Sequence, residues 1–240
     1  LATDTVFFNS DFHMDSFLNA LPRFLRHFPD HQELDSVNTI REKCRVLHLG
    51  MDLAKFDEHK SDHQDLPIIL WNHRWEYDKN PESFFNVLGK VKNNGFNFQL
   101  AVLGENFSQY PETFINAEKS FQSHIVQWGF ADSFSRYAQW LWKADILPVT
   151  SNQEFFGGSV MEAMYCDTWP ILPNRLTYPE LIPPDQHGEH LFKEENELYQ
   201  KLIWAIDNIE TVRSTHFHSI AQPFDWQSMV PMYDNAMEQV

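Results

Sequence analysis

Hydrophobic positions after about residue 66 form short apolar runs that alternate with longer amphipathic stretches. The apolar runs predict buried strands, and the stretches with apolar residues at three-to-four spacing predict helices. The predicted strands are 67–71, 98–103, 125–128, 146–150 and 169–172, and the predicted helices are 80–93, 111–121, 133–143, 158–165 and 194–209. Strands that alternate with helices indicate βαβ units, so we expect an α/β domain with a Rossmann-like parallel sheet and helices on both faces.

The first 49 residues carry a shorter form of the same pattern. Residues 6–8 predict a strand, 12–28 predict an amphipathic helix that Pro22 can kink, and 44–49 predict a second strand. The chain begins without Met, and a strand pattern is already present at Thr5 to Asn9. We therefore expect residues 1–49 to be the C-terminal remnant of an N-terminal Rossmann domain in a truncated chain.

Two further segments complete the predicted division of the chain. Residues 50–66 are charged and show no apolar period, which predicts a linker. Residues 67–222 then form the main Rossmann domain, and residues 223–240 form one more amphipathic helix. The linker also holds His59 and His63 four residues apart, but without an HExxH pattern a solvated segment is favoured over a metal site.

Composition and charge narrow the class of partner. Hydrophobic residues make up 42% and aromatic residues 15% of the chain, which is typical of a folded globular protein. The net charge of −16 disfavours non-specific binding to nucleic acid or to an acidic membrane, unless positive charge gathers locally. Cys44 and Cys166 lie far apart, and there is no secretory segment or membrane-length apolar run, so we expect a cytoplasmic protein without a structural zinc.

Positive charge follows the predicted strand at 67–71. In a parallel sheet, ligands bind beyond the carboxyl ends of the strands, and the loop there contains Arg74 and Lys79 just before a helix that Asn80 and Pro81 predict. An Arg fork, a Lys ammonium and a helix N-terminus can together hold a phosphate group. The alternative is a pair of surface cations among acidic neighbours, and the local sequence leaves both open.

Two carboxylates frame a glycine turn after the predicted strand at 146–150. Gly157 and Gly158 allow a ligand to approach the backbone closely, and the next helix presents free N–H groups. Glu154 precedes the turn and Glu162 lies about one helical turn beyond it, where a carboxylate can accept from sugar hydroxyls. Taken alone, an ordinary structural turn is the favoured interpretation.

Glycines also end two other predicted strands. Gly104 and Gly129 stand where the backbone can form a wall against a base or a ribose, although ordinary turns are favoured for each alone.

These motifs together resemble a known family. Arg74 and Lys79, the segment 154–157, Glu162 with the two residues after it, and Pro170 resemble the donor-binding half of retaining glycosyltransferases with the two-domain GT-B fold. The segments WNHRWEYDKNPESFF, LAVLGE, EFFGGSVMEAMYCDTWPILPNRLTYPELIP and FFNSDFHMDSFL resemble more closely the tRNA-queuosine α-mannosyltransferase family. The sequence departs from that family at Asp167, which replaces a glycine in a turn where Asp can adopt the left-handed conformation.

The resemblance implies a retaining hexosyltransferase that uses GDP-mannose as donor and queuosine in tRNA as acceptor, with no required cofactor or metal. It implies that Arg74 and Lys79 hold the diphosphate and that Glu154 contacts the transferred sugar. It also implies that Glu162 binds the ribose. The donor site is completed by the backbone around the glycine turn, at Phe155, Phe156, Gly157 and Gly158.

The acceptor side and the activity of this chain are less constrained by the sequence. Asn9, Ser10 and His13 follow the first predicted strand, and the resemblance implies that they face the cleft. The C-terminal helix is expected to cross back to the N-terminal remnant. The truncated chain can itself be inactive, and two alternatives stay open: a non-catalytic nucleotide-sugar binding module, and a sugar-nucleotide epimerase of the same fold.

Overall fold

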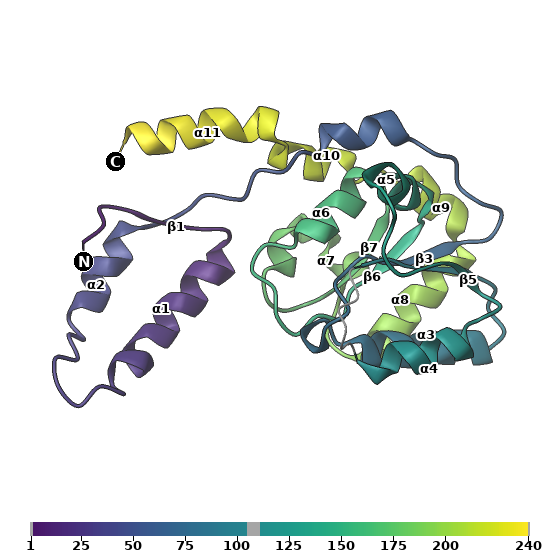
Figure 1. The fold of residues 1–240 in the computed structure, drawn as a ribbon, viewed down its shortest axis with the longest axis horizontal. Helices are drawn as coiled ribbons and strands as arrows, with labels where there is room; N and C mark the ends of the chain where they lie inside the picture. Colours follow the sequence, from purple (N-terminus) through teal and green to yellow (C-terminus); the bar gives the residue numbers. More distant parts are fainter. Residues whose placement is uncertain (1, 105–110, 240) are drawn as a thin grey trace.

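The computed structural model describes residues 2–104 and 111–239, and a six-stranded parallel sheet forms its main body (Figure 1). The strands run in the spatial order β5-β4-β3-β6-β7-β8. Their bounds are β3 Ile68–Trp71, β4 Gln99–Val102, β5 Ile125–Trp128, β6 Ile146–Pro148, β7 Trp169–Pro173 and β8 Leu191–Phe192. The predicted parallel α/β class is therefore confirmed, and β8 is a strand that the pattern did not predict.

The strand order creates a switch point between β3 and β6. From β3 the chain adds β4 and β5 on one side, and it then returns to place β6 on the other side of β3. At such a point the loops after the two strands are expected to leave the sheet in opposite directions, which predicts a crevice between the loops after β3 and β6 at the carboxyl ends of the strands. The first loop carries Arg74 and Lys79, and the second carries Glu154 and the glycine turn.

Helices cover both faces of this sheet. Figure 1 shows α3, α4 and α8 on one face and α5, α6 and α10 on the other. The bounds are α3 Pro81–Asn93, α4 Glu112–Ser120, α5 Phe134–Lys143, α6 Gly158–Tyr165, α8 Glu195–Asp207 and α10 His218–Ala221. Asn80 caps α3 as predicted, since its Oδ1 accepts a hydrogen bond from the Ser83 amide at 3.4 Å.

The core follows from the apolar runs. All four residues of β3 are buried, as expected for a strand covered on both faces. Beneath it the Trp75 and Phe114 rings stack at 4.3 Å, and Phe84 and Phe85 pack beside them against Trp71. This aromatic layer holds the start of the loop after β3 against the sheet, which gives the loop a rigid base.

Residues 50–66 are not a plain linker. A 3-10 helix, η1 Ala54–His59, lies inside this segment, and Leu53 and Phe56 are completely buried in the main core. The Phe56 carbonyl accepts a hydrogen bond from Trp142 at 2.8 Å. His63 pairs with the buried Asp145 at 3.1 Å, so this histidine serves the packing of the segment. Charge and missing periodicity hid two core residues there, because a short 3-10 helix has too few turns to show a period.

The N-terminal region forms a small separate layer. Strands β1 Val6–Phe8 and β2 Cys44–Val46 pair in parallel, and α1 Asp11–Leu25 and α2 Ser36–Lys43 pack beside them (Figure 1). The predicted helix at 12–28 ends three residues early, at Leu25, and Pro22 lies inside it. Helix α2 was not predicted. A small cluster of Phe8, Leu18 and Cys44 is buried between them.

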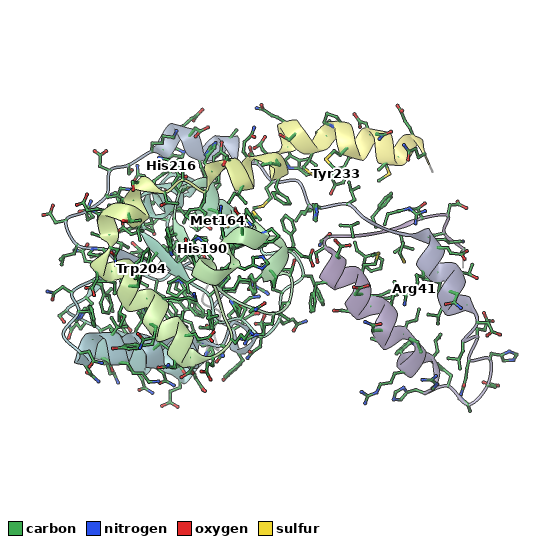
Figure 2. The ribbon with its side chains drawn as sticks, turned by 180° about the vertical axis from the view of Figure 1, so that it is seen from behind. Arg41, Met164, His190, Trp204, His216 and Tyr233 are labelled. Carbon is green, nitrogen blue, oxygen red and sulfur yellow. The ribbon has the colours of Figure 1, made fainter. Side chains whose placement is uncertain are left out.

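The C-terminal region returns to this small layer. The helix expected at 194–209 ends at Asp207, and α9 Ile209–Ser214, η5 Gln222–Phe224 and α11 Trp226–Glu238 follow. Figure 1 shows α11 running back over β1 and α2, and the hydroxyl of Tyr233 (Figure 2) donates to the His48 carbonyl at 3.0 Å. The remaining short elements are η2 Tyr77–Lys79, η3 Tyr178–Glu180, η4 Pro184–Gln186 and α7 His187–His190.

The turn after α6 behaves as its sequence predicts. Asp167 adopts the left-handed conformation, with φ of 61°. Its Oδ1 accepts hydrogen bonds from the Phe217 and His218 amides at 2.9 Å each. The side chain therefore compensates for backbone strain by capping the start of α10.

Candidate functional site

Lys79 and Glu154 meet in the crevice between β3 and β6. The Lys79 ammonium lies 3.4 Å from Glu154 Oε2 and 3.1 Å from Asp78 Oδ2, and it donates to the Gln153 carbonyl at 3.1 Å. Lys79 is only 8% exposed. The structure thus joins two residues that the sequence placed 75 positions apart, and a buried cation surrounded by oxygen acceptors is held in one position.

Glu154 is a fixed anion. Its Oε1 accepts hydrogen bonds from the Phe155 amide at 3.0 Å and from the Phe156 amide at 3.3 Å. Burial by itself raises the pKa of Glu154. The Lys79 charge and the amides of residues 155–157 lower it by more than burial raises it, so the pKa lies below its usual value. A carboxylate held in this way stays ionised and keeps the loop before α6 in shape.

Arg74 lies apart from this pair. Its guanidinium forms an ion pair with Glu76 at 3.0 Å, and the side chain is 56% exposed. A long exposed side chain can turn toward a ligand at small energetic cost, because a surface ion pair contributes little to stability. The convergence of Arg74 and Lys79 on one phosphate stays a prediction.

The two glycines of the turn differ in what they require. Gly157 has φ of 91°, and a Cβ there would lie 2.8 Å from Leu181 Cδ1, so both conformation and space favour glycine. A Cβ on Gly158 would have Met51 Cε as its nearest neighbour at 3.6 Å, an ordinary contact distance. Packing within the protein does not explain Gly158, which fits a position that a ligand approaches.

Glu162 is held by a tyrosine that the sequence did not single out. The Tyr137 hydroxyl donates to Glu162 Oε2 at 2.6 Å. Burial raises the pKa of Glu162 above its usual value, and the bond from Tyr137 and the Lys55 charge offset only part of that rise. Tyr137 lies on the buried side of α5. An aromatic residue at such a position is expected to belong to the hydrophobic core, so the sequence carried no signal for its contact with Glu162.

Gly104 and Gly129 end β4 and β5 with left-handed backbone, at φ of 120° and 92°. A Cβ on Gly104 would collide with the His73 carbonyl oxygen at 2.0 Å, so the close approach at Gly104 is to the protein itself. Gly104 also lines an apolar hollow of about 340 Å³ with Phe130, Phe134 and Tyr137. Because Tyr137 is hydrogen-bonded to Glu162, that hollow lies next to Glu162. The sequence predicted a base or ribose wall at Gly104. Glu105, the next residue, lies outside the described residues.

Ser10 and His13 contact the donor-side loop. The Ser10 hydroxyl donates to the Phe155 carbonyl at 2.6 Å and accepts from the His13 amide at 3.0 Å. The His13 ring stacks on Phe155 with centroids 4.4 Å apart, and burial lowers the pKa of His13. Ser10 is only 1% exposed, so it joins the two layers and caps α1 rather than facing an open cleft.

One further residue, Glu180, completes the contact between the layers, whereas Asn9 bonds within the small layer. The Asn9 carbonyl accepts from His48 at 2.8 Å, which leaves its proposed acceptor role a prediction. Glu180, which the sequence did not single out, accepts from the Asp11 and Phe12 amides at 3.0 and 2.7 Å. A carboxylate at a helix N-terminus stabilises it, so Glu180 helps to fix α1 beside the site.

Asn72 and His73 are polar residues buried at the end of β3. The Asn72 amide donates to the Ser159 carbonyl at 2.7 Å, and His73 Nδ1 lies 2.9 Å from the Ser159 hydroxyl. Burial, followed by the Lys79 charge, lowers the pKa of His73 to about 4, so the ring is neutral at pH 7. Two polar residues directly after an apolar strand are the signal in the sequence that could have identified them.

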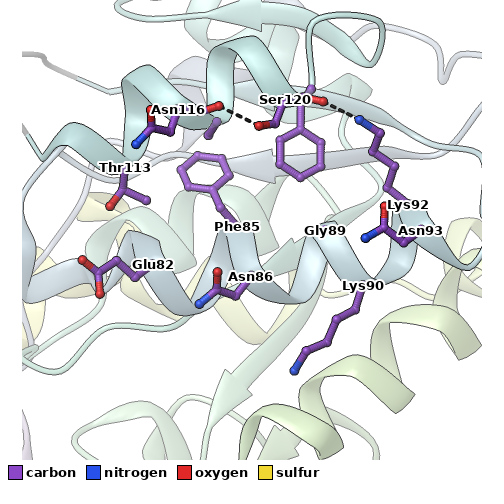
Figure 3. A pocket seen from close by; sticks show the side chains of 12 residues that line it. Glu82, Phe85, Asn86, Gly89, Lys90, Lys92, Asn93, Thr113, Asn116 and Ser120 are labelled. Atoms are coloured by element: carbon purple, nitrogen blue, oxygen red, sulfur yellow. Dashed lines mark hydrogen bonds between the residues drawn. The ribbon is translucent and has the colours of Figure 1, made fainter.

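A groove of about 760 Å³ between α3 and α4 lies away from this crevice (Figure 3). Lys92 donates to the Ser120 carbonyl there, and Lys90 pairs with Glu195 at 3.6 Å. Its cations are therefore engaged within the protein. In residues 2–104 and 111–239 no group of three or more His, Cys, Asp or Glu side chains is placed to hold a metal ion. No helix in the same ranges is long and apolar enough to cross a membrane.

Comparison with known families assigns the larger part of the chain to one of them. Residues 54–215 match the family model of the glycosyl transferases group 1. The chain belongs to this family. Residues 1–51 match the N-terminal model of tRNA-queuosine alpha-mannosyltransferase. The two matched regions meet in the segment that contains Met51 and Leu53, where the small layer joins the main sheet.

Individual relatives agree with the family. The chain is 33% identical to the tRNA-queuosine alpha-mannosyltransferase of Drosophila melanogaster over 211 residues, which cover 84% of this chain and 55% of that protein. It is 24% identical to a probable sucrose-phosphate synthase of Thermosipho melanesiensis over 220 residues, covering 88% and 51% of the two chains. The chain thus spans about half the length of the curated relatives it matches.

Solved structures show the same fold at low identity. A glycosyltransferase from Rickettsia africae matches with a TM-score of 0.74 at 17% identity, over 98% of this chain and 63% of that one. Anabaena HepE, solved with UDP and glucose, matches with a TM-score of 0.72 at 17% identity, over 99% and 64%. These similarities confirm the predicted GT-B glycosyltransferase fold.

Proposed function

We propose that this chain carries the donor site of a retaining enzyme that transfers mannose from GDP-mannose to queuosine in tRNA. The observation that carries the proposal is the meeting of Lys79, Glu154 and the first turn of α6 at the switch point of the sheet. Mannose, queuosine and tRNA are taken from the similarity of residues 1–51 to the queuosine mannosyltransferase model and from the Drosophila relative.

The proposed donor binds across the carboxyl ends of the strands. The diphosphate lies against the amides around Gly157 and Gly158 at the start of α6, with Lys79 and Arg74 beside it. The ribose hydroxyls reach Glu162, and the base enters the apolar hollow beside Phe130 and Phe134. Glu154 contacts the transferred sugar, for which its position next to Lys79 is suitable.

The proposed reaction breaks the bond between the sugar C1 and the diphosphate oxygen and forms one from C1 to the acceptor hydroxyl oxygen. Negative charge builds on the departing diphosphate, and Lys79, Arg74 and the N-terminus of α6 stabilise it there. The acceptor attacks from the face that the diphosphate leaves, which retains configuration, and its proton passes to a diphosphate oxygen. No step in this scheme requires a metal ion.

A tRNA acceptor must bind despite the acidic composition. With a net charge of −16, the general surface repels a polyanion, so the proposed tRNA contact is made by a local basic patch or by protein outside these residues. As an enzyme of tRNA modification it is expected to act in the cytoplasm.

Donor binding and transfer are tested separately. Titration with GDP, UDP and GDP-mannose by calorimetry should show binding of GDP and GDP-mannose, and no affinity for any of the three contradicts the donor site. Incubation with GDP-mannose and queuosine-containing tRNA should release GDP and label the tRNA, and β-linked mannose in the product contradicts retention.

A binding module without catalysis is the second candidate. Binding of a nucleotide sugar needs only the arrangement of Lys79, Glu154 and the first turn of α6, whereas transfer also needs an acceptor site. The test joins this chain to the remaining length of the Drosophila relative. Tight binding of GDP-mannose by the joined protein, without transfer of mannose, supports this candidate. Epimerised sugar nucleotide, detected by NMR without tRNA, indicates instead the epimerase alternative.

A further inference from the structure

A continuous polar network crosses the switch point beneath the candidate donor site. It begins at Glu162 on α6 and passes to Tyr137 on α5 through the hydrogen bond of 2.6 Å. Asn72, at the end of β3, lies close enough to Tyr137 to lower the pKa of its hydroxyl, and it donates to the Ser159 carbonyl on α6 at 2.7 Å. The network therefore connects the middle of α6 to its first turn through α5 and the end of β3.

Burial makes this network rigid. Asn72 is 6% exposed and His73 is 4% exposed, and both stand where an apolar strand ends. A buried hydrogen bond is costly to leave unmade, so Tyr137, Asn72 and Ser159 hold each other in one arrangement. Two buried atoms, Asn72 Oδ1 and His73 Nε2, have no hydrogen-bond partner among the described residues. Unpartnered buried polar atoms at a switch point are typical of a site shaped for function rather than for stability alone.

Glu162 is prepared for one kind of contact. Tyr137 occupies Oε2, so Oε1 is the oxygen left for a ligand. Tyr137 from α5 is hydrogen-bonded to this carboxylate, and Lys55 from η1 and Cys166 at the end of α6 lie near enough to interact with it electrostatically. Burial raises the pKa of both the Tyr137 hydroxyl and the Cys166 thiol, so neither adds negative charge beside Glu162 at neutral pH.

We propose that Tyr137 and Asn72 are positioning residues for the donor. They hold the Glu162 carboxylate and the first turn of α6 in one fixed geometry, so that the ribose and the diphosphate of a nucleoside diphosphate meet their binding groups together. This inference rests on the proposed function for its ligand, a nucleoside diphosphate, and for the contacts of the ribose with Glu162 and of the diphosphate with the start of α6.

The deciding experiment measures coupling between Tyr137 and the ribose. Calorimetry compares GDP with 2′,3′-dideoxy-GDP on the full chain and on Tyr137→Phe. Loss of one hydrogen bond should weaken GDP binding about 3- to 10-fold, while dideoxy-GDP, which cannot reach Glu162, should change less than about 2-fold. An equal loss for both ligands, or no loss for GDP, overturns the proposal.

Acid titration gives a readout that a merely structural role does not change. Glu162 accepts best when ionised, so the preference for GDP over dideoxy-GDP should fall as pH falls through the pKa of Glu162. The Tyr137 hydrogen bond lowers that pKa, so Tyr137→Phe should lose the preference at a higher pH than the unaltered chain. The ratio of the dissociation constants of the two ligands is free of the effect of phosphate titration, because both ligands carry the same diphosphate. An unchanged midpoint overturns the proposal.

Tyr165→Phe is the matched control. The Tyr165 hydroxyl also donates to a carboxylate, Asp57 Oδ2 at 3.0 Å, from the end of α6 that is remote from the turn. This variant should keep the ribose preference and its pH midpoint. If Tyr137→Phe does not fold, 3-fluorotyrosine at position 137 keeps the hydroxyl and makes it a stronger donor, so the midpoint should move to lower pH. A midpoint that stays in place contradicts the role of Tyr137.

The same series separates this inference from the proposed function. If the unaltered chain binds none of the nucleotides, the donor site itself is wrong. If it binds GDP and Glu162→Gln abolishes the ribose preference, but Tyr137→Phe leaves it intact, then the donor site stands and the positioning role of Tyr137 is overturned.

Discussion

The two glutamates of the site occupy opposite electrostatic environments, although they lie on one loop and helix. Glu154 faces the Lys79 ammonium and backbone amides, which hold its pKa below the usual value. Glu162 faces the neutral Tyr137 hydroxyl, and burial holds its pKa above the usual value. One region therefore holds fixed charge beside the proposed diphosphate and sugar, and in the other region burial outweighs the Tyr137 hydrogen bond and the Lys55 charge beside the proposed ribose and base.

This contrast indicates how one crevice can treat two parts of a ligand differently. Fixed charges stabilise the charge that develops when a diphosphate leaves, because they are already oriented before the reaction. A desolvated carboxylate with one oxygen occupied discriminates by hydrogen-bond geometry instead. Variants on each side should therefore differ in which part of the ligand they affect.

Lys79→Ala should have the largest effect. Loss of a charge-assisted contact should weaken GDP binding about 100-fold, and binding of guanosine much less. The variant should also lose stability, because the buried Glu154 is left without its cation. Calorimetry with both ligands measures the difference, and Lys90→Ala, an exposed lysine paired with Glu195, is the control. Equal losses for GDP and guanosine contradict the role of Lys79 at the diphosphate.

The glycine turn should separate folding from binding. Gly157→Ala places a Cβ in left-handed backbone against Leu181 and should lower the free energy of unfolding by about 1–3 kcal/mol. Gly158→Ala meets no close protein atom and should keep or slightly raise stability, yet weaken GDP binding. Urea unfolding and calorimetry on the two variants give this comparison, and unchanged GDP affinity in Gly158→Ala indicates that no phosphate approaches the turn.

Arg74→Ala should have an intermediate effect that is confined to the diphosphate. Its side chain is exposed, so the free energy of unfolding should stay within about 0.5 kcal/mol. GDP binding should weaken about 10-fold and guanosine binding should not change. If GDP binding is also unchanged, Arg74 is a surface cation, the alternative that its sequence context left open.

The smallest expected effect is the pH dependence of stability. The lowered pKa of Glu154 contributes stability above the unfolded value of about 4.3 that is lost as pH falls through the folded pKa. The raised pKa of Glu162 contributes stability below about 4.3 that is lost as pH rises through its folded pKa. Relative to the unaltered chain, Glu154→Gln should lose stability as pH rises from acid to neutral, and Glu162→Gln should gain it. If the free energy of unfolding of both variants, relative to the unaltered chain, changes in the same direction with pH, the contrast between the two environments is contradicted.

Most of the main sheet was predictable because its strands are continuous apolar runs and its helices are long enough to show a period. Alternation of the two elements then limited the topology to a parallel sheet. The exceptions share one cause. η1 and β8 are too short to carry a pattern, and α2 has a single buried residue, Val37, so hydrophobic periodicity does not mark it.

The candidate site divides in the same way. Lys79, Glu154 and Gly157 stand in loops after predicted strands and Glu162 in the helix that follows, where local sequence marks them. Tyr137, Asn72, His73 and Glu180 were missed, because each acts on an element that is remote in sequence. Ser10 was singled out for an open cleft, but its hydroxyl is used to join α1 to the Phe155 loop.

The sequence alone determined the α/β class, the acidic surface and the glycosyltransferase-like spacing of Glu154 and Glu162, because these depend on composition, on periodicity and on residues close together in the chain. Only the tertiary structure decided which groups touch. The return of the chain from β5 to β6 brings the end of β3 against α6, and burial there sets the partner and the pKa of each glutamate. Partners and desolvation are properties of neighbours in space, and a one-dimensional pattern does not contain them.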